Sequence, residues 1–589
     1  MQNNDVVFKK GEIILGLTLF VLFVAFLQTN YCYHFYYMEQ IQLFLFNAQW
    51  AEDVLLQPGG VSLWLSRFMV QFFVVPWAGS IIISILLYGV WWSTKKGISG
   101  SSKSMQTSLL SLFPVVSLYP VIIDPNYFLQ GIIAYLFFIL FFVGYRSFSD
   151  SWGRHLTGLF MGSILYLIAG PVSILFAVCV LLWEFVTKGI RWYISLVLLA
   201  VVLLLALASL HFSVVGEFRF AFLPDAYADP QIDGSKGYLA WIVFPFCILA
   251  SHYYNNRIPK TANRKRKYST LLIPILLLAG LFAGCYSRYG LTGTIQEKQL
   301  DYYAYTKQWN KLLAVELKDP MSERKMNLVN YALAQQGKLG DAMFAYNQQG
   351  VKSLVSTWDN SITTAMPMSD IYYGIGDVAS AQKFAFEGCV SSVNGGSSRL
   401  LKRLVETNLI MGAYRVAEKY IALLEQTLFY KEWASGYRQL LFNDEAVEKH
   451  PVLGSRRKGL DGIAGKAVSA HLLQELEMLA VNNPKNQTAF QYLAAFYLVN
   501  KDLSRFKLLL EKYYATDVWP QLAVTQQQAL PFIAPDDRKY WIQHGMSSET
   551  EHQYTLFERE LVAQDGSSAI QKRLGEKYGD TYWYYLLFK

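Results

Sequence analysis

The strongest constraint on this chain is a series of apolar runs of membrane-spanning length that stops near Gly290. A spanning helix needs about 20 mostly apolar residues, and nine stretches fit this pattern. The expected spans are Gly11–Gln28, Phe72–Trp92, Ser108–Ile123, Tyr127–Tyr145, Leu156–Gly170, Pro171–Val186, Tyr193–Phe212, Leu239–Tyr254 and Thr270–Tyr289. The fifth and sixth are short and abut, so a broken or re-entrant pair is the alternative there. We therefore predict an all-α chain in which residues 1–290 form a polytopic membrane domain.

The distribution of Lys and Arg predicts the orientation of these spans. If the nine runs alternate across the membrane, fifteen basic residues fall in the inner segments, and only Arg67, Arg219 and Lys236 fall in outer loops between spans. Cytoplasmic loops are enriched in Lys and Arg, so the amino terminus is expected in the cytoplasm. An odd number of spans then places the carboxy-terminal domain outside, which is the periplasm in a two-membraned bacterium. Treating the fifth and sixth runs as a non-spanning hairpin does not change this result.

Residues 291–589 are polar and helical, and they contain a weak internal repeat. This part carries 33 basic and 32 acidic residues, a balance that offers no basic surface for nucleic acid. Three glycines (Gly337, Gly376 and Gly412) are each followed five residues later by alanine, at spacings of 39 and 36 residues. The pattern resembles tetratricopeptide repeats, although the aromatic residue expected early in the first helix is missing. The resemblance implies an α-solenoid, a fold that mostly binds partners.

Motifs of soluble enzymes are absent, so the outer surface of the membrane domain is the place to look for chemistry. The eight histidines form no HExxH pair, and neither a phosphate-binding loop nor a GxSxG elbow is present. The first outer loop, residues 29–71, holds Glu39, Glu52 and Asp53 and breaks at Pro58-Gly59-Gly60. The segment Val61–Gln71 has polar faces and is expected to lie as an amphipathic helix at the membrane surface.

This order of features resembles the C-type glycosyltransferase superfamily, multi-spanning enzymes that use polyprenyl-linked sugar donors. Met38–Gln42 (MEQIQ) stands where that family has a pair of acidic residues, and Gln57–Leu65 (QPGGVSLWL) stands where many members have a Pro-Pro-Leu turn. A tetratricopeptide tail outside the membrane also occurs in some members. This chain departs from the pattern at Gln40, which replaces the second acid and puts the metal site of the family in doubt.

The resemblance assigns roles to five residues. Glu39 is expected to act as the general base toward an acceptor, with Asp53 as a second catalytic acid. Asp124, in the short second outer loop, is expected to complete a divalent cation site, while Arg67 and Arg219 would contact the donor phosphate. The alternative is that these side chains are solvated loop residues.

Two functions therefore compete at the level of sequence. In the first, the protein transfers a sugar or glycan from a polyprenyl-phosphate carrier to an acceptor, and the helical repeats bind a protein partner or acceptor. In the second, it is a non-enzymatic scaffold, anchored in membrane lipid, whose repeats bind envelope proteins. A transporter is disfavoured, because apart from Arg67, near the start of the second expected span, no charge lies in the middle of a span, and such charges usually mark ion pathways.

Overall fold

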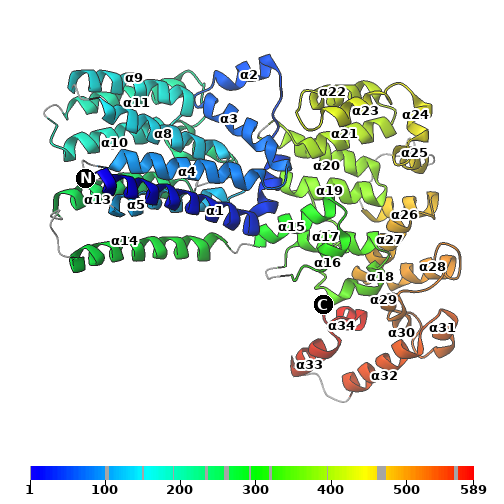
Figure 1. The fold of residues 1–589 in the computed structure, drawn as a ribbon. Coiled ribbons are helices and arrows are strands. Elements are labelled where there is room, and N and C mark those ends of the chain that lie inside the picture. The colour runs from blue at the N-terminus through cyan, green and yellow to red at the C-terminus, as the bar shows by residue number, and fades with distance from the viewer. Residues whose placement is uncertain are drawn as a thin grey trace. The chain divides into compact units, whose positions relative to one another are not determined.

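The computed structural model describes residues 2–99, 105–148, 151–189, 192–232, 236–257, 264–290, 293–317, 321–393, 395–460, 472–562 and 568–589. Within these ranges the chain is helical, with three isolated β-bridges and no strand (Figure 1). It divides into two compact units. The first is formed by Met1–Ile295 with two short later segments, and the second by the remaining residues.

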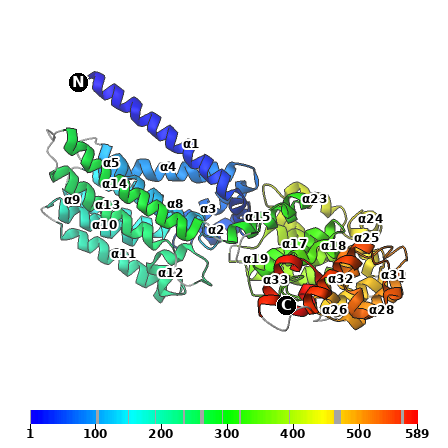
Figure 2. The same ribbon diagram turned by 90° about the horizontal axis from the view of Figure 1, so that it is seen from below.

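The first unit is built from membrane-length and shorter helices joined by brief turns. It contains α1 (Gln2–Gln40), α2 (Ala48–Leu55), α3 (Gly60–Val70), η1 (Gln71–Val74), α4 (Ala78–Ile98), α5 (Met105–Leu110), α6 (Leu112–Ser117), α7 (Tyr119–Ile122), α8 (Leu129–Ser147), α9 (Ser151–Ala169), α10 (Val172–Val186), α11 (Ile194–His211), α12 (Phe218–Phe222), η2 (Pro224–Tyr227), α13 (Tyr238–Arg257), α14 (Arg264–Cys285) and η3 (Tyr286–Gly290). Towards its amino terminus, α1 projects beyond the other helices of this unit (Figure 2).

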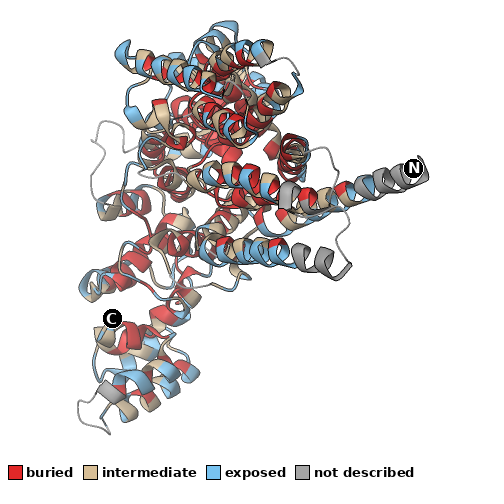
Figure 3. Cartoon of the chain, turned by 90° about the vertical axis from the view of Figure 1, so that its left-hand side faces the viewer, coloured by how far each residue is buried: buried red, intermediate tan, exposed pale blue. Residues whose placement is uncertain are grey.

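Four segments of the described chain are long and apolar enough to cross a membrane: Ile13–Gln40, Leu129–Ser147, Ile194–His211 and Leu272–Gly290. Four shorter apolar helices cover Gly60–Val74, Thr107–Ile122, Val172–Val186 and Tyr238–Tyr254. The candidate spans expose large apolar side chains, for example Leu17 on α1, Leu204 on α11 and Leu276 on α14 (Figure 3). Such surfaces suit contact with lipid, so the first unit is consistent with a membrane protein.

Proline and glycine explain where the helices depart from the expected spans. The third expected span is divided into α5, α6 and α7, and Pro114 and Pro120 lie in the last two of these. The expected second span starts later than predicted, because a 3-10 turn and Pro76 precede α4. The fifth and sixth expected spans are two separate helices, α9 and α10, which pack against each other around Gly170-Pro171. Proline cannot donate a helical hydrogen bond, and it breaks or bends a helix interior.

The first outer loop contains much more helix than the sequence indicates. α1 continues to Gln40, because Thr29–Gln40 contains neither Gly nor Pro. The predicted amphipathic helix is present as α3, but its polar side chains Ser62 and Ser66 are fully buried, while Val61 and Leu63 on the other faces are partly exposed. α3 packs this polar face against α8 and α9. It is therefore a helix of the bundle with its polar face inward.

The second unit consists of short antiparallel helices. It contains α15 (Gly293–Tyr305), α16 (Trp309–Leu313), α17 (Glu323–Gln335), α18 (Leu339–Ala342), η4 (Met343–Ala345), α19 (Ile362–Ile375), α20 (Val378–Val390), α21 (Ser398–Ile410), α22 (Tyr414–Leu424), α23 (Lys431–Arg438), α24 (Asp444–Lys449), α25 (Leu453–Leu460), α26 (Leu472–Asn482), α27 (Gln487–Val499), α28 (Leu503–Tyr513), α29 (Val524–Gln527), α30 (Leu530–Ile533), α31 (Arg538–Gln543), α32 (Ser548–Val562), α33 (Ser568–Tyr578) and α34 (Tyr582–Phe588).

The three repeat glycines turn the chain between consecutive helices of this unit. Gly337, Gly376 and Gly412 have φ values of 72°, 107° and 73°, a left-handed conformation that side chains disfavour. Helices α19, α20, α21 and α22 each pack against the next. At the carboxy terminus, Trp583 of α34 is fully buried and donates a hydrogen bond of 2.8 Å from its indole to the Gln528 carbonyl. The aromatic end of the chain is thus part of the core of the second unit.

Candidate functional site

The predicted catalytic acid Glu39 lies in the last turn of α1 and is buried. Its side chain is 3% exposed, and neighbouring Gln40 donates a side-chain hydrogen bond to its carboxylate. Asp53, the second predicted acid, lies on α2, and its side chain is exposed. The two acids therefore occupy different environments, one inside the protein and one at the surface.

Arg67, predicted to contact the donor phosphate, lies on the inward face of α3. It is buried, and its guanidinium carbon is 5.7 Å from the centroid of the Trp50 ring. Trp50 is held at the start of α2, where the Asn47 side chain accepts a hydrogen bond of 3.2 Å from its backbone N–H. Arg67 is thus packed into the protein, in contrast to a solvated loop cation.

Asp124 and Arg219 lie in two loops that the structure joins. The Phe128 N–H donates to the Tyr227 carbonyl at 2.9 Å, and the Asp229 N–H donates to the Asn126 carbonyl at 2.7 Å. Within these loops the two charges have partners of their own. Asp124 is 3.0 Å from the Lys236 ammonium, and Arg219 is 2.7 Å from the Glu217 carboxylate. In the described parts of the chain no three His, Cys, Asp or Glu residues gather in a way that could hold a metal ion. The divalent cation at Asp124 remains a prediction.

The two glycine-containing breaks noted in the sequence meet in the first unit. The Gly59 N–H donates a hydrogen bond of 2.8 Å to the Leu167 carbonyl near the end of α9. A β-carbon on Gly59 would lie 3.3 Å from the backbone nitrogen of Gly170, and both glycines have positive φ. Tyr227 completes this junction, because its hydroxyl donates to the Ala169 carbonyl at 2.6 Å and accepts from the Val172 N–H at 3.1 Å. The buried Tyr227 hydroxyl therefore bridges the end of α9 and the start of α10.

Replacing Tyr227 with phenylalanine is expected to destabilise the first unit. The change leaves the Ala169 carbonyl and the Val172 N–H without their partner, and an unsatisfied buried polar group costs about 1–3 kcal/mol. We expect a lower melting temperature for the detergent-solubilised protein, measured by tryptophan fluorescence. Tyr193→Phe, which alters an exposed tyrosine, should leave the melting temperature unchanged. Equal melting temperatures for Tyr227→Phe and the wild type would contradict this account of the junction.

The second unit contains a cavity of about 480 Å³ whose lining is both basic and aromatic. Seven helices contribute to its walls: α15, α16, α17, α19, α21, α23 and α25. The basic side chains in the lining are Lys307, Arg399, Lys402, Arg403 and Arg456, and the acidic ones are Asp370 and Glu406. The aromatic side chains are Tyr305, Trp309, Tyr331, Tyr373 and Tyr437. Most of the charge comes from α21, where spacings of three and four residues place Arg399, Lys402 and Arg403 on one face.

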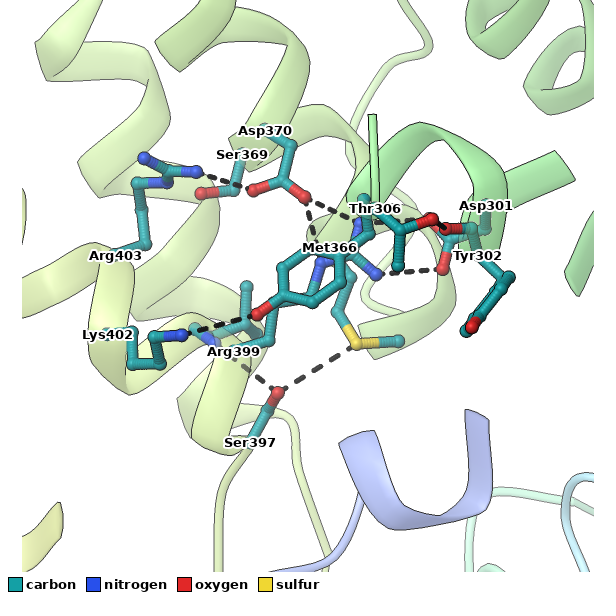
Figure 4. A network of polar contacts seen from close by, with 12 residues as sticks. Asp301, Tyr302, Thr306, Met366, Ser369, Asp370, Ser397, Arg399, Lys402 and Arg403 are labelled. Carbon is teal, nitrogen blue, oxygen red and sulfur yellow. Dashed lines mark hydrogen bonds and ion pairs between the residues drawn. The ribbon is translucent and has the colours of Figure 1, made fainter. Parts of the chain in front are cut away.

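A chain of ion pairs forms one wall of this cavity (Figure 4). Arg399 contacts Asp301 at 2.8 Å and Asp370 at 2.6 Å, and Asp370 contacts Arg403 at 2.7 Å. Arg403 then reaches Glu406 at 2.6 Å. Burial by itself would raise the pKa of the Asp370 carboxyl, but Arg399 and Arg403 outweigh it and hold the pKa below its ordinary value. These four side chains and Asp301 therefore neutralise one another, apart from one negative charge.

One charged group of the cavity, Arg456, stands outside this network. It donates a hydrogen bond of 3.2 Å to the Gly374 carbonyl, and among the described residues no carboxylate forms an ion pair with it, although the charge of Glu406 acts on it. The Tyr373 hydroxyl and the Nε of Arg403 are buried without a hydrogen-bond partner in the described structure. Burial lowers the pKa of Arg456 and raises that of Tyr373, yet arginine stays charged in proteins. The cavity therefore presents the Arg456 guanidinium to whatever occupies it.

One family model matches nearly the whole chain. A family model described as "Family of unknown function (DUF6057)" matches residues 8–589. The chain belongs to DUF6057. The match runs through both units, so the family is defined by the membrane helices together with the second unit. No curated protein and no solved structure matches this DUF6057 chain.

Sequence reasoning missed the cavity of the DUF6057 chain because it searched for catalytic motifs. The available signal was the segment Ser398–Glu406 (SRLLKRLVE), in which three cations share a helix face. A basic stripe of this kind is usually solvated, but here carboxylate partners lie on other helices, Asp301 on α15 and Asp370 on α19. The tertiary fold brings them together.

Proposed function

We propose that this protein is a membrane-anchored binding protein whose second unit holds an anionic ligand in the cavity around Arg456. The observation that carries the proposal is Arg456 itself. It is a half-buried guanidinium in an aromatic cavity, and no described carboxylate lies within ion-pair distance of it. An anionic ligand would provide the missing partner.

The energetics of burial favour a ligand at this position. Removing an unpaired charge from water is unfavourable. Ionisable residues whose pKa is perturbed, as that of Arg456 is by burial, cluster at functional sites. The cavity volume of about 480 Å³ lies within the range of small-molecule sites, about 300–1,000 Å³. Arg399 and Arg403 are neutralised within the ion-pair wall, which keeps one negative charge, and Lys307, Lys402 and Arg456 make the lining positive, a balance that attracts anions. The hydrogen bond from Arg456 to Gly374 uses one of five N–H groups and leaves the others for a ligand.

The proposal also includes the side of the membrane on which the cavity lies. The excess of Lys and Arg in alternate connections of the nine expected spans supports a cytoplasmic amino terminus and an extracytoplasmic second unit. The left-handed turns at Gly337, Gly376 and Gly412 support a tetratricopeptide-like solenoid. The ligand would then be met outside the cytoplasmic membrane, where envelope proteins are the predicted macromolecular partners.

Calorimetry on the full-length protein in detergent tests the proposal. The probes are glucuronate, glucose 6-phosphate and inorganic phosphate, each titrated into the wild type and Arg456→Gln. We expect at least one of the three to bind the wild type and to bind the variant much more weakly. Failure of all three to bind, or equal affinity for both proteins, would overturn the proposal.

Glycosyl transfer from a lipid carrier is the second candidate function, and the burial of Glu39 favours it. Carboxylates are rarely buried, and Glu39 is 3% exposed, so it is set apart from the solvated acids of the first outer loop. Arg67, also buried in the first unit, would serve the donor phosphate. Asp53, Asp124 and Arg219 keep their predicted roles in this candidate, with a divalent cation at Asp124.

If the protein is such an enzyme, Glu39→Gln should abolish glycan transfer while the protein still accumulates. The amide keeps the shape of the side chain but cannot act as a general base, which typically contributes a factor of about 100 to 10,000 in rate. Transfer is read by lectin blotting of envelope glycans in cells that carry only the variant. Glu52→Gln, at an exposed position of α2, is the matched control. Wild-type glycan patterns in the Glu39→Gln cells would exclude this candidate.

A further inference from the structure

We infer that the ligand of the second unit extends past Arg456 into a neighbouring polar pocket, so that it is an elongated anion with uncharged hydrogen-bonding groups. The inference rests on the proposed function, because it takes Arg456 as the partner of the negative charge on the ligand. It adds the extent of the site and the chemical class of the ligand, which the charge of the cavity alone does not specify.

The polar pocket has a volume of about 250 Å³ and adjoins the larger cavity at Arg456. Three residues line both spaces, namely Gln335, Gly374 and Arg456. Most small-molecule sites have volumes of about 300–1,000 Å³, so the polar pocket is small for a site of its own. It is better explained as an extension of the larger cavity, with Arg456 between the two.

The lining of the polar pocket offers hydrogen bonds with almost no charge. Of the described residues that form it, Arg456 is the only one with a charged side chain. Five others carry an amide or a hydroxyl: Gln335, Ser455, Asn483, Asn486 and Thr488. All five keep exposed surface, so a ligand can reach them. Amides and hydroxyls pair with the same uncharged groups on a ligand.

Arg456 and Asn486 place nitrogen atoms beside Gly376, which belongs to the lining of the polar pocket. A β-carbon on Gly376 would lie 3.1 Å from Nη1 of Arg456 and 2.8 Å from Nδ2 of Asn486. The Asn486 amide is fixed in place, because Oδ1 accepts from the Ala489 N–H at 3.2 Å and Nδ2 donates to the Ile375 carbonyl at 2.7 Å. Since Nδ2 carries two N–H groups, the second can serve a ligand that pairs with Arg456.

A ligand that matches these groups has a hydrogen-bond acceptor next to its charge. The planar guanidinium of Arg456 can hold two oxygens of an anionic group with parallel hydrogen bonds. A nearby hydroxyl or carbonyl oxygen on the same ligand would accept a hydrogen bond from Asn486. A compact anion such as acetate would pair with Arg456 alone and leave the polar pocket without a ligand contact.

The test is calorimetry on the full-length protein in detergent, with acetate, N-acetylglycinate and glucuronate as separate probes. Each probe carries a single carboxylate, and the two longer probes add an amide or hydroxyls. We expect the longer probes to bind at least about fivefold more tightly than acetate, the value of one hydrogen bond. In Asn486→Ser their affinity should fall about fivefold, while the affinity for acetate should stay unchanged.

The serine variant removes the amide N–H but keeps a side-chain oxygen that can cap α27. Asn443→Ser is the matched control, because Asn443 caps α24 in the same way and lies outside the described lining of both spaces. It should bind all three probes as the wild type does. If Asn486→Ser does not fold, Asn483→Ala changes the same pocket and should likewise weaken the longer probes alone.

The remaining outcomes separate this inference from the function on which it rests. Equal affinity for acetate and the longer probes would overturn the extended site but keep an anion-binding protein. Unchanged affinity for the longer probes in Asn486→Ser and Asn483→Ala, with a loss in Arg456→Gln, would do the same. If none of the three probes binds, the inference fails, and if phosphate and glucose 6-phosphate also fail to bind, the proposed function fails with it.

Discussion

Asp370→Asn is expected to lower the free energy of unfolding of the second unit by about 3 kcal/mol, because breaking a buried ion pair leaves an uncompensated charge. Asp370 is shared by Arg399 and Arg403, and the side chain of Arg399 is 2% exposed. Asparagine accepts a hydrogen bond but carries no charge, so both arginines lose a counter-ion. Hydrogen exchange of peptides from α19 and α21, in the full-length protein, measures the effect directly.

The same carboxylate should make the stability of the second unit depend on pH. The pKa of Asp370 is held below the ordinary 3.8, so its stabilisation is complete above that value. It is lost as the pH falls from about 3.8 through the lower pKa of the folded state. The variant should lack this acid-dependent loss. Glu445→Gln, which breaks an exposed pair with Lys449, should change neither the stability nor the pH dependence, because exposed pairs contribute little. A variant at Asp370 as stable as the wild type would show that the ion-pair wall is not structural.

Arg456→Gln is expected to weaken the binding of an anionic ligand by ten- to about a hundredfold, since hydrogen bonds to charged groups contribute about 1.5–3 kcal/mol. The fold should be kept, because Arg456 forms no ion pair with a described carboxylate, and its hydrogen bond to the Gly374 carbonyl is long, at 3.2 Å. Binding is measured by titration calorimetry of glucuronate into the full-length protein. Arg415→Gln, at an exposed position of α22, controls for the loss of one positive charge at the surface. Equal loss in both variants would mean that net charge, and not the cavity, attracts the anion.

The helical class and the membrane character of the chain follow from the periodicity and length of its apolar runs. Four of the nine expected spans correspond to helices that meet both criteria of length and apolarity. The turns at the repeat glycines could also be predicted, because Gly376 and its two equivalents occupy a backbone region closed to most side chains. Apolar runs and glycine turns depend on neighbouring residues in the chain, so they can be read from the sequence.

Features that depend on tertiary packing could not be predicted. Glu184 on α10 is 1% exposed and pairs with Arg154 of α9 at 3.0 Å, a contact that depends on how the two helices pack. The polar face of α3 was expected to face water, but it packs inward and buries Arg67. The cavity is the clearest case, since Asp301 and Arg456 are brought to one site by helices far apart in the chain.

The predicted site residues show the same division between local and long-range information. Candidate acids are recognisable by type, so Glu39 and Asp53 could be selected from the sequence. Whether each acid is buried could not be predicted. The burial of Glu39 depends on the uninterrupted continuation of α1 and on the residues that pack around it. Likewise, the partner of Asp124 is Lys236, more than a hundred residues later.

The central claim is that the cavity of the second unit holds an anionic ligand against Arg456. The most direct measurement is a cryo-electron microscopy map of the full-length protein in detergent with saturating glucuronate, compared with a map recorded without it. The account predicts additional density in the cavity that contacts the Arg456 guanidinium. A cavity that stays empty at saturation, or density bound elsewhere on the protein, would contradict it.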